Sequence, residues 1–331
     1  MILVVGANGF LGSKLIRELK KKKLKFFKID KSLIGKEKVD ITNYKSLEKF
    51  FNLKKIKVII NCACEPATSK SKKNIFLTNV IGNKNLINLS EKKNIKKYIF
   101  FSTSAIWVKD YKNYVTEKTK TSPVESYGES KVKAEKDIIY SKLKSWTIFR
   151  IPMIVSYKRL GILSILFDFI INNKKIPIIN NGKNLVQFIH IDDLSRFVIK
   201  SLEINEKQVY NLASNEAVTL KKLFLNLIKS INSKSKLISF RDYGLTYILS
   251  ILNKINLSPL NIYHIKMLKF SLAMKTNKIT KRYKMQTKIK TSTMLIAALK
   301  NYMKKSSKTE YRTEITSPIK MRIIKLLYYL L

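Results

Sequence analysis

Tyr127 and Lys131 are the two residues whose types and spacing best suit proton transfer in this chain. They stand four residues apart in the run Tyr-Gly-Glu-Ser-Lys, and positions i and i+4 of a helix lie on one face. A free phenol titrates near pH ~10 and is a poor base at neutral pH. A lysine charge about 5 Å away, at an effective dielectric of about 20, is worth roughly 3 kcal/mol, or about two pKa units. We therefore expect Lys131 to lower the pKa of Tyr127, so that the phenol serves as a general base toward a hydroxyl group.

A second source of chemistry is the hydroxyl pair Thr103 and Ser104, which follows the apolar segment 97–101. That segment is typical of a strand, and the carboxyl ends of parallel strands are where ligands bind in this kind of sheet. Either hydroxyl can hydrogen-bond the substrate oxygen that loses its proton to the tyrosine. For Tyr127 and Lys131, the alternative interpretation is an ordinary surface helix, because a Tyr/Lys pair at this spacing arises by chance in many Lys-rich chains.

The element that must position these side chains begins at the first residues. Residues 2–5 are apolar and mostly β-branched, as expected of a buried parallel strand. Gly6, Gly9 and Gly12 follow at three-residue spacing, and a helical pattern begins at Ser13. Strand, glycine turn and helix bring backbone N–H groups and the positive end of a helix dipole to one point, where a pyrophosphate fits.

Asp30 ends a second predicted strand, 25–29, and strengthens the prediction of a dinucleotide site. A carboxylate there accepts hydrogen bonds from the ribose hydroxyls and repels a 2′-phosphate, which favours NAD over NADP. The neighbouring Lys31 weakens that preference. The alternative interpretation is a solvated aspartate in a turn.

The order of the predicted elements gives the fold class. Strands alternate with helices from residue 1 to about residue 155, which indicates crossover connections and a parallel sheet. We expect an α/β fold, a Rossmann-type doubly wound parallel sheet with a smaller, mostly helical C-terminal substrate lobe. The predicted divisions are a cofactor domain over 1–155 with a return segment over about 184–213, a lobe formed by 156–183 and 214–305, and a basic linker with an amphipathic tail over 306–331. Within these divisions we expect one long helix over 75–89, a strand over 186–189, and a helix over 194–202 capped by Asp192 and Asp193.

Composition excludes several classes of protein. No apolar run reaches the ~18 residues of a membrane span, and the first strand follows Met1 directly, so we expect neither a transmembrane helix nor a signal peptide and place the protein in the cytoplasm. The two cysteines, Cys62 and Cys64, are too close in sequence for an ordinary disulfide, and only two histidines are available to join them at a metal. We expect small core residues in a reducing compartment and no metal site.

The charge is unusual. The chain has 66 basic and 22 acidic residues, a formal charge of +44, and Asp242 is the only acidic residue between Ala217 and Thr309. Such a field attracts polyanions, either nucleotide phosphates, anionic lipid or nucleic acid. Nucleic acid is the partner we favour least, since the lysines are spread along the chain with no aromatic-rich binding signature.

Taken together, these motifs resemble the extended short-chain dehydrogenase/reductase family, the NAD-dependent epimerases and dehydratases of nucleotide sugars, over about residues 1–305. The resemblance implies NAD as cofactor, a nucleotide-sugar substrate, and catalysis by Thr103, Tyr127 and Lys131. It also implies that His190, in Phe-Ile-His-Ile-Asp-Asp, packs as a structural residue. The implied cofactor contacts are Gly6, Asn8, Gly9, Phe10, Leu11, Gly12, Asp30, Asp40, Ile41, Ala63, Asn79, Lys131 and Pro152.

Departures from the family pattern bear on the substrate. Dehydratases of the family carry Asp-Glu after the catalytic threonine, whereas this chain has Ser104 and Ala105, so dehydration is disfavoured. The expected reaction is epimerisation with retained NAD, in the manner of a 4-epimerase of surface polysaccharide precursors. A 4-keto-sugar reductase and a non-catalytic nucleic-acid binder are the alternatives. The segment after Arg150 that normally holds the diphosphate is replaced, which leaves Ser104, Arg159 and Lys183 as candidate substrate contacts.

The last residues form a separate feature. In 318–331 the apolar residues fall near one helical stripe with basic residues around it, so this segment can lie on an anionic membrane surface at the inner face of the membrane. The alternatives are packing on the enzyme or in the interface of a homodimer.

Overall fold

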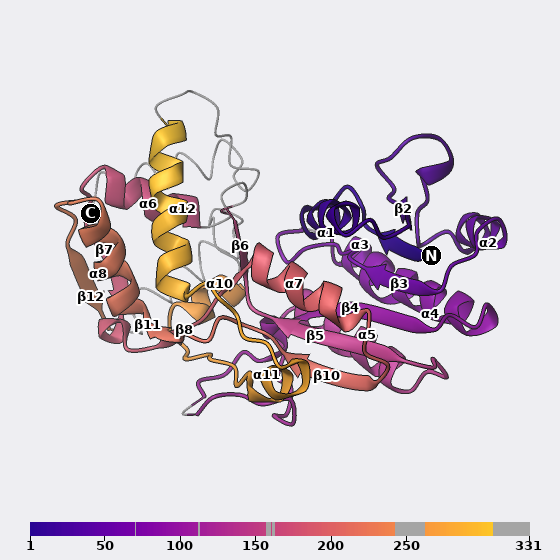
Figure 1. Cartoon of the computed structure of the whole chain (residues 1–331). Coiled ribbons are helices and arrows are strands. Elements are labelled where there is room, and N and C mark those ends of the chain that lie inside the picture. The colour runs from indigo at the N-terminus through magenta and orange to yellow at the C-terminus, as the bar shows by residue number, and fades with distance from the viewer. Residues whose placement is uncertain (70, 112, 157–159, 161–162, 242–261, 307–331) are drawn as a thin grey trace.

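A computed structural model of the chain describes residues 1–69, 71–111, 113–156, 160, 163–241 and 262–306. Its centre is a six-stranded sheet in the order β10-β5-β4-β3-β1-β2, with every neighbouring pair parallel (Figure 1). The expected doubly wound parallel sheet is confirmed. The strands are β1 (Ile2–Val5), β2 (Phe26–Ile29), β3 (Val58–Asn61), β4 (Lys97–Thr103), β5 (Trp146–Ile151) and β10 (Lys207–Asn211).

Helices cover both faces of this sheet, because successive residues of a strand point to opposite sides. In β1, Ile2 and Val4 pack with α1 (Phe10–Lys21) and α7 (Ile191–Ser201), together with α11 (Asn277–Tyr283). Leu3 and Val5 pack on the other face, with α2 (Tyr44–Asn52), α4 (Asn83–Lys92) and α5 (Ser126–Ile139). Each face has its own apolar cluster, which is why β1, whose residues belong to both clusters, is apolar along its whole length.

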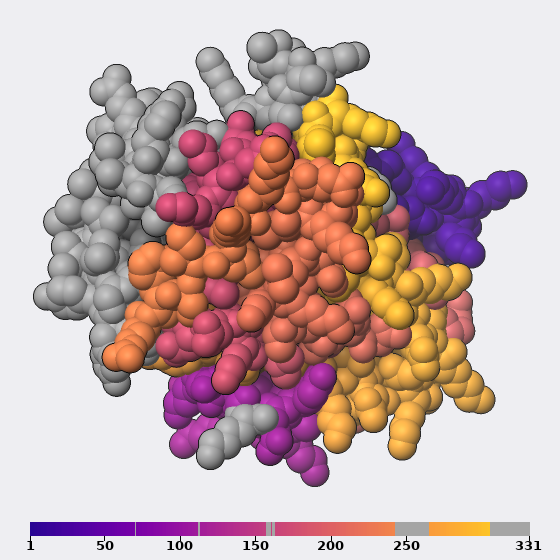
Figure 2. All heavy atoms as spheres, turned by 90° about the vertical axis from the view of Figure 1, so that its left-hand side faces the viewer, coloured from indigo at the N-terminus to yellow at the C-terminus, as the bar shows by residue number. Residues whose placement is uncertain are grey.

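The C-terminal lobe has a core of its own, in which α6 (Leu163–Ile171), α8 (Leu220–Ser230) and α12 (Thr291–Ser306) pack together. Figure 2 views the lobe from its outer side, where the orange side chains around α8 fill the middle and the yellow residues of α12 lie beside them. Short strands accompany the helices. These are β6 (Ile154–Val155) with β9 (Ile189–His190), β7 (Ile176–Ile179) with β12 (Leu237–Phe240), and β8 (Leu185–Val186) with β11 (Val218–Thr219). The helix α10 (Ile262–Met267) lies beside the start of β8, where Asn184 Nδ2 donates to Met267 O at 3.1 Å.

Three predicted elements differ from the structure. The long helix over 75–89 is divided into α3 (Lys72–Phe76), a π-helical segment η2 (Leu77–Gly82), which contains Asn79, and α4. The strand over 186–189 is two strands, because Val186 pairs with Val218 and Ile189 pairs with Ile154.

The helix predicted from Leu194 begins at Ile191. Its N-cap is His190, whose Nδ1 accepts a hydrogen bond from Asp192 N at 3.3 Å, so the two aspartates occupy the first turn instead of the cap. At 4% exposed, His190 is buried as expected, and burial lowers its pKa.

Three short 3-10 segments complete the described part: η1 (Gly35–Glu37), η3 (Ser104–Ile106) and η4 (Asn180–Gly182). None of the helices in the described ranges combines the length and apolarity needed to cross a bilayer. Helix α12 continues to Ser306, so the beginning of the predicted linker is helical. The amphipathic tail and Arg159 lie outside the described residues.

Candidate active site

The glycine turn after β1 forms one side of the site. Gly6 has a φ of +73°, and a Cβ on it would lie 2.6 Å from Ala63 N, so only glycine lets the turn approach the segment after β3. A Cβ on Gly12 would lie 2.1 Å from Gly6 O. The N-cap of α1 is Gly9, and no side chain caps this helix end. The positive end of the α1 dipole therefore lies at the glycine turn, which fits a bound pyrophosphate.

Asp30 lies beside this turn with its carboxylate held in place. Oδ2 accepts a hydrogen bond from Asn8 N at 3.2 Å, and Oδ1 accepts from Ser32 N at 2.9 Å and Ser32 Oγ at 2.7 Å. Asn8 Nδ2 also donates to Ser32 Oγ at 2.9 Å. These bonds tie the end of β2 to the glycine turn, so the carboxylate is fixed where a ribose is expected.

The pair Asp40 and Ile41 lies next along the chain. Asp40 is exposed, and its Oδ1 accepts bonds from Thr42 N at 2.9 Å and Thr42 Oγ1 at 2.8 Å. Ile41 is buried against Gly82, where an added Cβ would lie 2.5 Å from Ile41 Cγ1. Ile41 thus packs closely against Gly82 at the end of η2.

Thr103 and Lys131 lie at the carboxyl end of β4, and Tyr127 lies beside Lys131. Thr103 ends β4 beside Ile151, which Pro152 follows, and its Oγ1 accepts a hydrogen bond from Ala105 N at 3.1 Å. Lys131 is only 3% exposed, and its Nζ donates to Phe101 O at 3.0 Å. The same ammonium lies 6.0 Å from the centroid of the Tyr127 ring, so the structure places the two residues on one face of α5. Ser104, at 3% exposed, is buried just beyond Thr103.

Cys64 belongs to this site, although the sequence predicted two core cysteines. That prediction is wrong for Cys64, which is exposed because the chain leaves the sheet after Asn61. Its Sγ lies 4.0 Å from Tyr127 Oη. Both cysteines are free, and burial raises the pKa of the Cys62 thiol. No feature of the sequence distinguishes Cys64 from Cys62, because which of them reaches the tyrosine depends on the path of the loop.

Asn79 connects this loop to the helix that carries Tyr127. Its Nδ2 donates to Glu65 O at 3.0 Å and to Ser130 Oγ at 3.1 Å, and its Oδ1 accepts from Glu65 N at 2.8 Å. Ser130 Oγ in turn donates to Tyr127 O at 2.7 Å. Asn79 is 1% exposed, so its amide holds protein groups around the predicted cofactor site. Ser130 was missed by sequence reasoning, although it stands inside the Tyr-Gly-Glu-Ser-Lys run.

Lys183, a candidate substrate contact, is placed on the lobe. It follows η4 and is exposed, and a Cβ on the preceding Gly182 would lie 2.9 Å from Lys221 N at the start of α8. Lys183 therefore stands beside α8 instead of at the end of β4 with Ser104.

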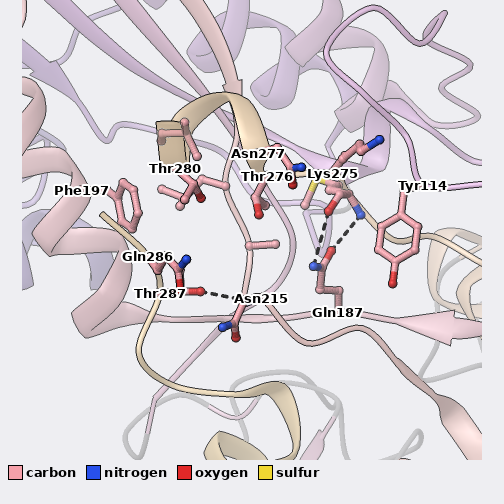
Figure 3. A pocket seen from close by; sticks show the side chains of 14 residues that line it. Tyr114, Gln187, Phe197, Asn215, Lys275, Thr276, Asn277, Thr280, Gln286 and Thr287 are labelled. Carbon is pink, nitrogen blue, oxygen red and sulfur yellow. Dashed lines mark hydrogen bonds between the residues drawn. The ribbon is translucent and has the colours of Figure 1, made fainter. Parts of the chain in front are cut away.

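A cavity of about 400 Å³ lies apart from the predicted catalytic residues (Figure 3). It is found where β10 ends, between α7 and α11, with Phe197, Asn215 and Thr280 among its lining side chains. The Gln187 amide at its wall accepts from Met274 N at 2.8 Å and donates to Ser214 O at 2.6 Å. These bonds hold the lobe against the end of the sheet.

The sequence of the chain matches a protein-family model. The model of the NAD dependent epimerase/dehydratase family covers residues 2–213. That range is more than half of the chain and includes the glycine turn, Asp30, Thr103, Tyr127 and Lys131. The chain belongs to this family, which confirms the expected resemblance and NAD as the cofactor.

Individual relatives are distant. The chain is 27% identical over 280 residues to the uncharacterised protein y4nG of Sinorhizobium fredii, covering 83% of this chain and 70% of that protein. It is 25% identical over 246 residues to a putative UDP-glucose 4-epimerase of Methanocaldococcus jannaschii, covering 68% and 80%.

Solved structures share the fold. UDP-glucose 4-epimerase of Thermotoga maritima, determined with UDP-glucose, superposes with a TM-score of 0.73 at 17% identity, covering 92% of this chain and 99% of that one. The Bordetella bronchiseptica enzyme WbmG in complex with NAD gives a TM-score of 0.73 at 18% identity, covering 92% and 94%.

Proposed function

We propose that this protein is an NAD-dependent epimerase that inverts a ring carbon of a nucleotide-activated sugar, in the manner of a 4-epimerase. The observation that supports the proposal is that Lys131 bonds Phe101 O of β4, the strand that ends at Thr103, and lies 6.0 Å from the Tyr127 ring, in the sheet that also carries the glycine turn. The printed names of two relatives, the putative UDP-glucose 4-epimerase and a UDP-glucuronate 4-epimerase of Thermodesulfobacterium geofontis, support the substrate class. As part of the same proposal, the reaction supplies precursors for a surface polysaccharide.

In this proposal the phenol of Tyr127 removes the proton from a sugar hydroxyl, and Thr103 Oγ1 hydrogen-bonds the same oxygen. Bound NAD supplies reversible acceptance of a hydride from the carbon that carries this hydroxyl. Lys131 is held against the sheet by Phe101 O, so its charge stays near the Tyr127 ring and favours the phenolate. After the oxidised sugar ring has turned over to present its other face, Tyr127 returns the proton to the sugar oxygen.

Dehydration is disfavoured by the residues that follow Thr103. Ser104 and Ala105 are 3% and 5% exposed, and neither is a carboxylic acid that could exchange protons with substrate. A dTDP-D-glucose 4,6-dehydratase of Dictyostelium discoideum is nevertheless among the relatives, at 28% identity over 65% of this chain.

A 4-keto-sugar reductase is the alternative that uses the same three residues. A dTDP-4-dehydro-6-deoxyglucose reductase of Escherichia coli is 27% identical over 73% of this chain. A reductase consumes one reduced cofactor per product, whereas an epimerase returns its cofactor unchanged. Incubation with UDP-sugars and dTDP-4-keto sugars, followed at 340 nm and by product chromatography, distinguishes the two reactions.

Replacement of Tyr127 by Phe tests the assignment directly. We expect turnover to fall by about 10²-fold or more because the proton acceptor is lost, while NAD binding, measured by calorimetry, stays unchanged. Tyr140→Phe is the matched control, since Tyr140 follows the same helix and is 84% exposed. Wild-type turnover by the Tyr127→Phe enzyme contradicts the proposal. Mass spectrometry of small molecules that co-purify with the protein then identifies the sugar and nucleotide.

A further inference from the structure

An ion pair spans the glycine turn. Lys31 follows β2 and Glu65 follows β3, and their side chains approach to 3.8 Å between Nζ and Oε2. In the sheet, β1 lies between β2 and β3. The pair therefore connects the loops on the two sides of the turn in which the cofactor pyrophosphate is expected.

Lys31 pairs with Glu65, whereas the carboxylate of Asp30, the acid nearest to it in sequence, is held by other groups. Both carboxylate oxygens of Asp30 accept hydrogen bonds, from Asn8 N and from Ser32. The backbone of Glu65 is fixed on the β3 side of the glycine turn, because its N–H and C=O both bond the buried amide of Asn79. The Glu65 side chain is also the more buried partner, at 21% exposed against 65% for Lys31.

This geometry bears on which dinucleotide binds. Asp30 opposes a 2′-phosphate, but an ammonium on the next residue is the kind of group that attracts one. We propose that Glu65 is a specificity-determining residue: by pairing with Lys31 it withholds that ammonium from a 2′-phosphate and keeps the site selective for NAD. The inference rests on the NAD-binding role of the site.

The size of the effect follows from the exposure of the pair. Exposed ion pairs are weak and screened by salt, so the release of Lys31 is worth a factor of about three to five in relative affinity at low ionic strength. The same factor declines as the salt concentration rises.

The experiment measures dissociation constants for NAD and NADP by calorimetry with the full chain. We expect Glu65→Gln to shift the affinity ratio about three- to fivefold toward NADP, and the double variant Lys31→Gln/Glu65→Gln to return it to the wild-type value. Glu37→Gln is the matched control, because Glu37 also pairs with a lysine of the β2 region, Lys28, at 3.0 Å. This control removes the same charge without releasing Lys31.

The measured affinity ratios show which of the two proposals fails. Equal ratios in Glu65→Gln and Glu37→Gln overturn the proposal, because they show only a general effect of charge. A gain for NADP that persists in the double variant overturns it too, because Lys31 is then not the group released. Failure of the wild-type protein to bind NAD overturns the proposed function together with this inference, whereas an unchanged ratio with normal NAD binding overturns the inference alone.

Discussion

Lys131 shows how much of a residue's chemistry depends on neighbours from other elements. Its spacing from Tyr127 is a helix property, but its ammonium is held by Phe101 O at 3.0 Å and lies 4.7 Å from the Phe100 ring centroid. Both partners come from β4. The Lys131 charge can therefore stabilise the phenolate of Tyr127 only when α5 is packed against β4.

Lys97 is a buried lysine that the proposed chemistry does not use. It is 1% exposed, and its Nζ donates to Thr147 Oγ1 at 3.1 Å and to Ile204 O. Burial lowers its pKa from 10.5 to about 8, with Glu206 opposing the shift and Arg282 adding to it. The unfolded chain therefore binds more protons between these two pH values, and the free energy of unfolding rises with pH there.

We expect this contribution to stabilise the fold by about 2 kcal/mol more at pH 9.5 than at pH 7.5. Lys97→Met should remove this pH-dependent contribution. The difference in unfolding free energy between the variant and the wild type should therefore change by about 2 kcal/mol between pH 7.5 and pH 9.5. Urea unfolding at the two pH values measures the change, with the exposed neighbour Lys96→Met as control. Parallel pH profiles for wild type and Lys97→Met contradict the prediction.

Helix α5 is the element on which the site depends, and it is fastened to the sheet twice. Beyond the bond from Lys131 to Phe101 O, Glu135 accepts hydrogen bonds from Arg150 Nε at 3.0 Å and Nη2 at 2.6 Å. These side chains are 4% and 8% exposed. Tyr127, Lys131 and Glu135 recur every four residues, so one face of α5 carries the base, its charge partner and an anchor.

Glu135→Gln is expected to lower the free energy of unfolding by about 3 kcal/mol, because it leaves the Arg150 charge buried without its counter-charge. Chemical denaturation measures this loss. Glu203→Gln is the control: its pair with Lys200, at 2.6 Å, is exposed, and its removal should cost less than about 0.5 kcal/mol. Equal losses for the two variants would show that the buried pair does not hold α5.

At the scale of the whole molecule, the charge of +44 is the property that the fold leaves unexplained. Some lysines are used locally: Lys14 pairs with Asp192 at 2.5 Å, which joins α1 to α7, and with Glu18 of its own helix at 2.8 Å. With 22 acidic residues against 66 basic ones, the acidic residues cannot neutralise most of the positive charge. Anionic ligands or surfaces are therefore favoured in general, without selection among them.

The amphipathic tail gives this charge one specific use that can be tested. We expect the full chain to bind vesicles containing phosphatidylglycerol, and a chain shortened by residues 317–331 to bind them less, since both the apolar stripe and its basic residues are removed. Flotation assays at low and high salt, with phosphatidylcholine vesicles as control, measure the difference. Unchanged binding after the deletion refutes a membrane role for the tail. Binding to RNA that falls steeply with salt would favour the nucleic-acid alternative instead.

The sequence by itself determined the alternation of strands and helices, the glycine turn, Asp30 and the triplet Thr103, Tyr127 and Lys131. These features are local, because strand and helix periodicity and the steric needs of glycine act over a few residues. The pairing of Lys31 with Glu65 and the exposure of Cys64 were decided only by the tertiary structure. Each of these depends on which loops the parallel sheet brings to one edge, and residues distant in sequence become neighbours there only after the chain has packed.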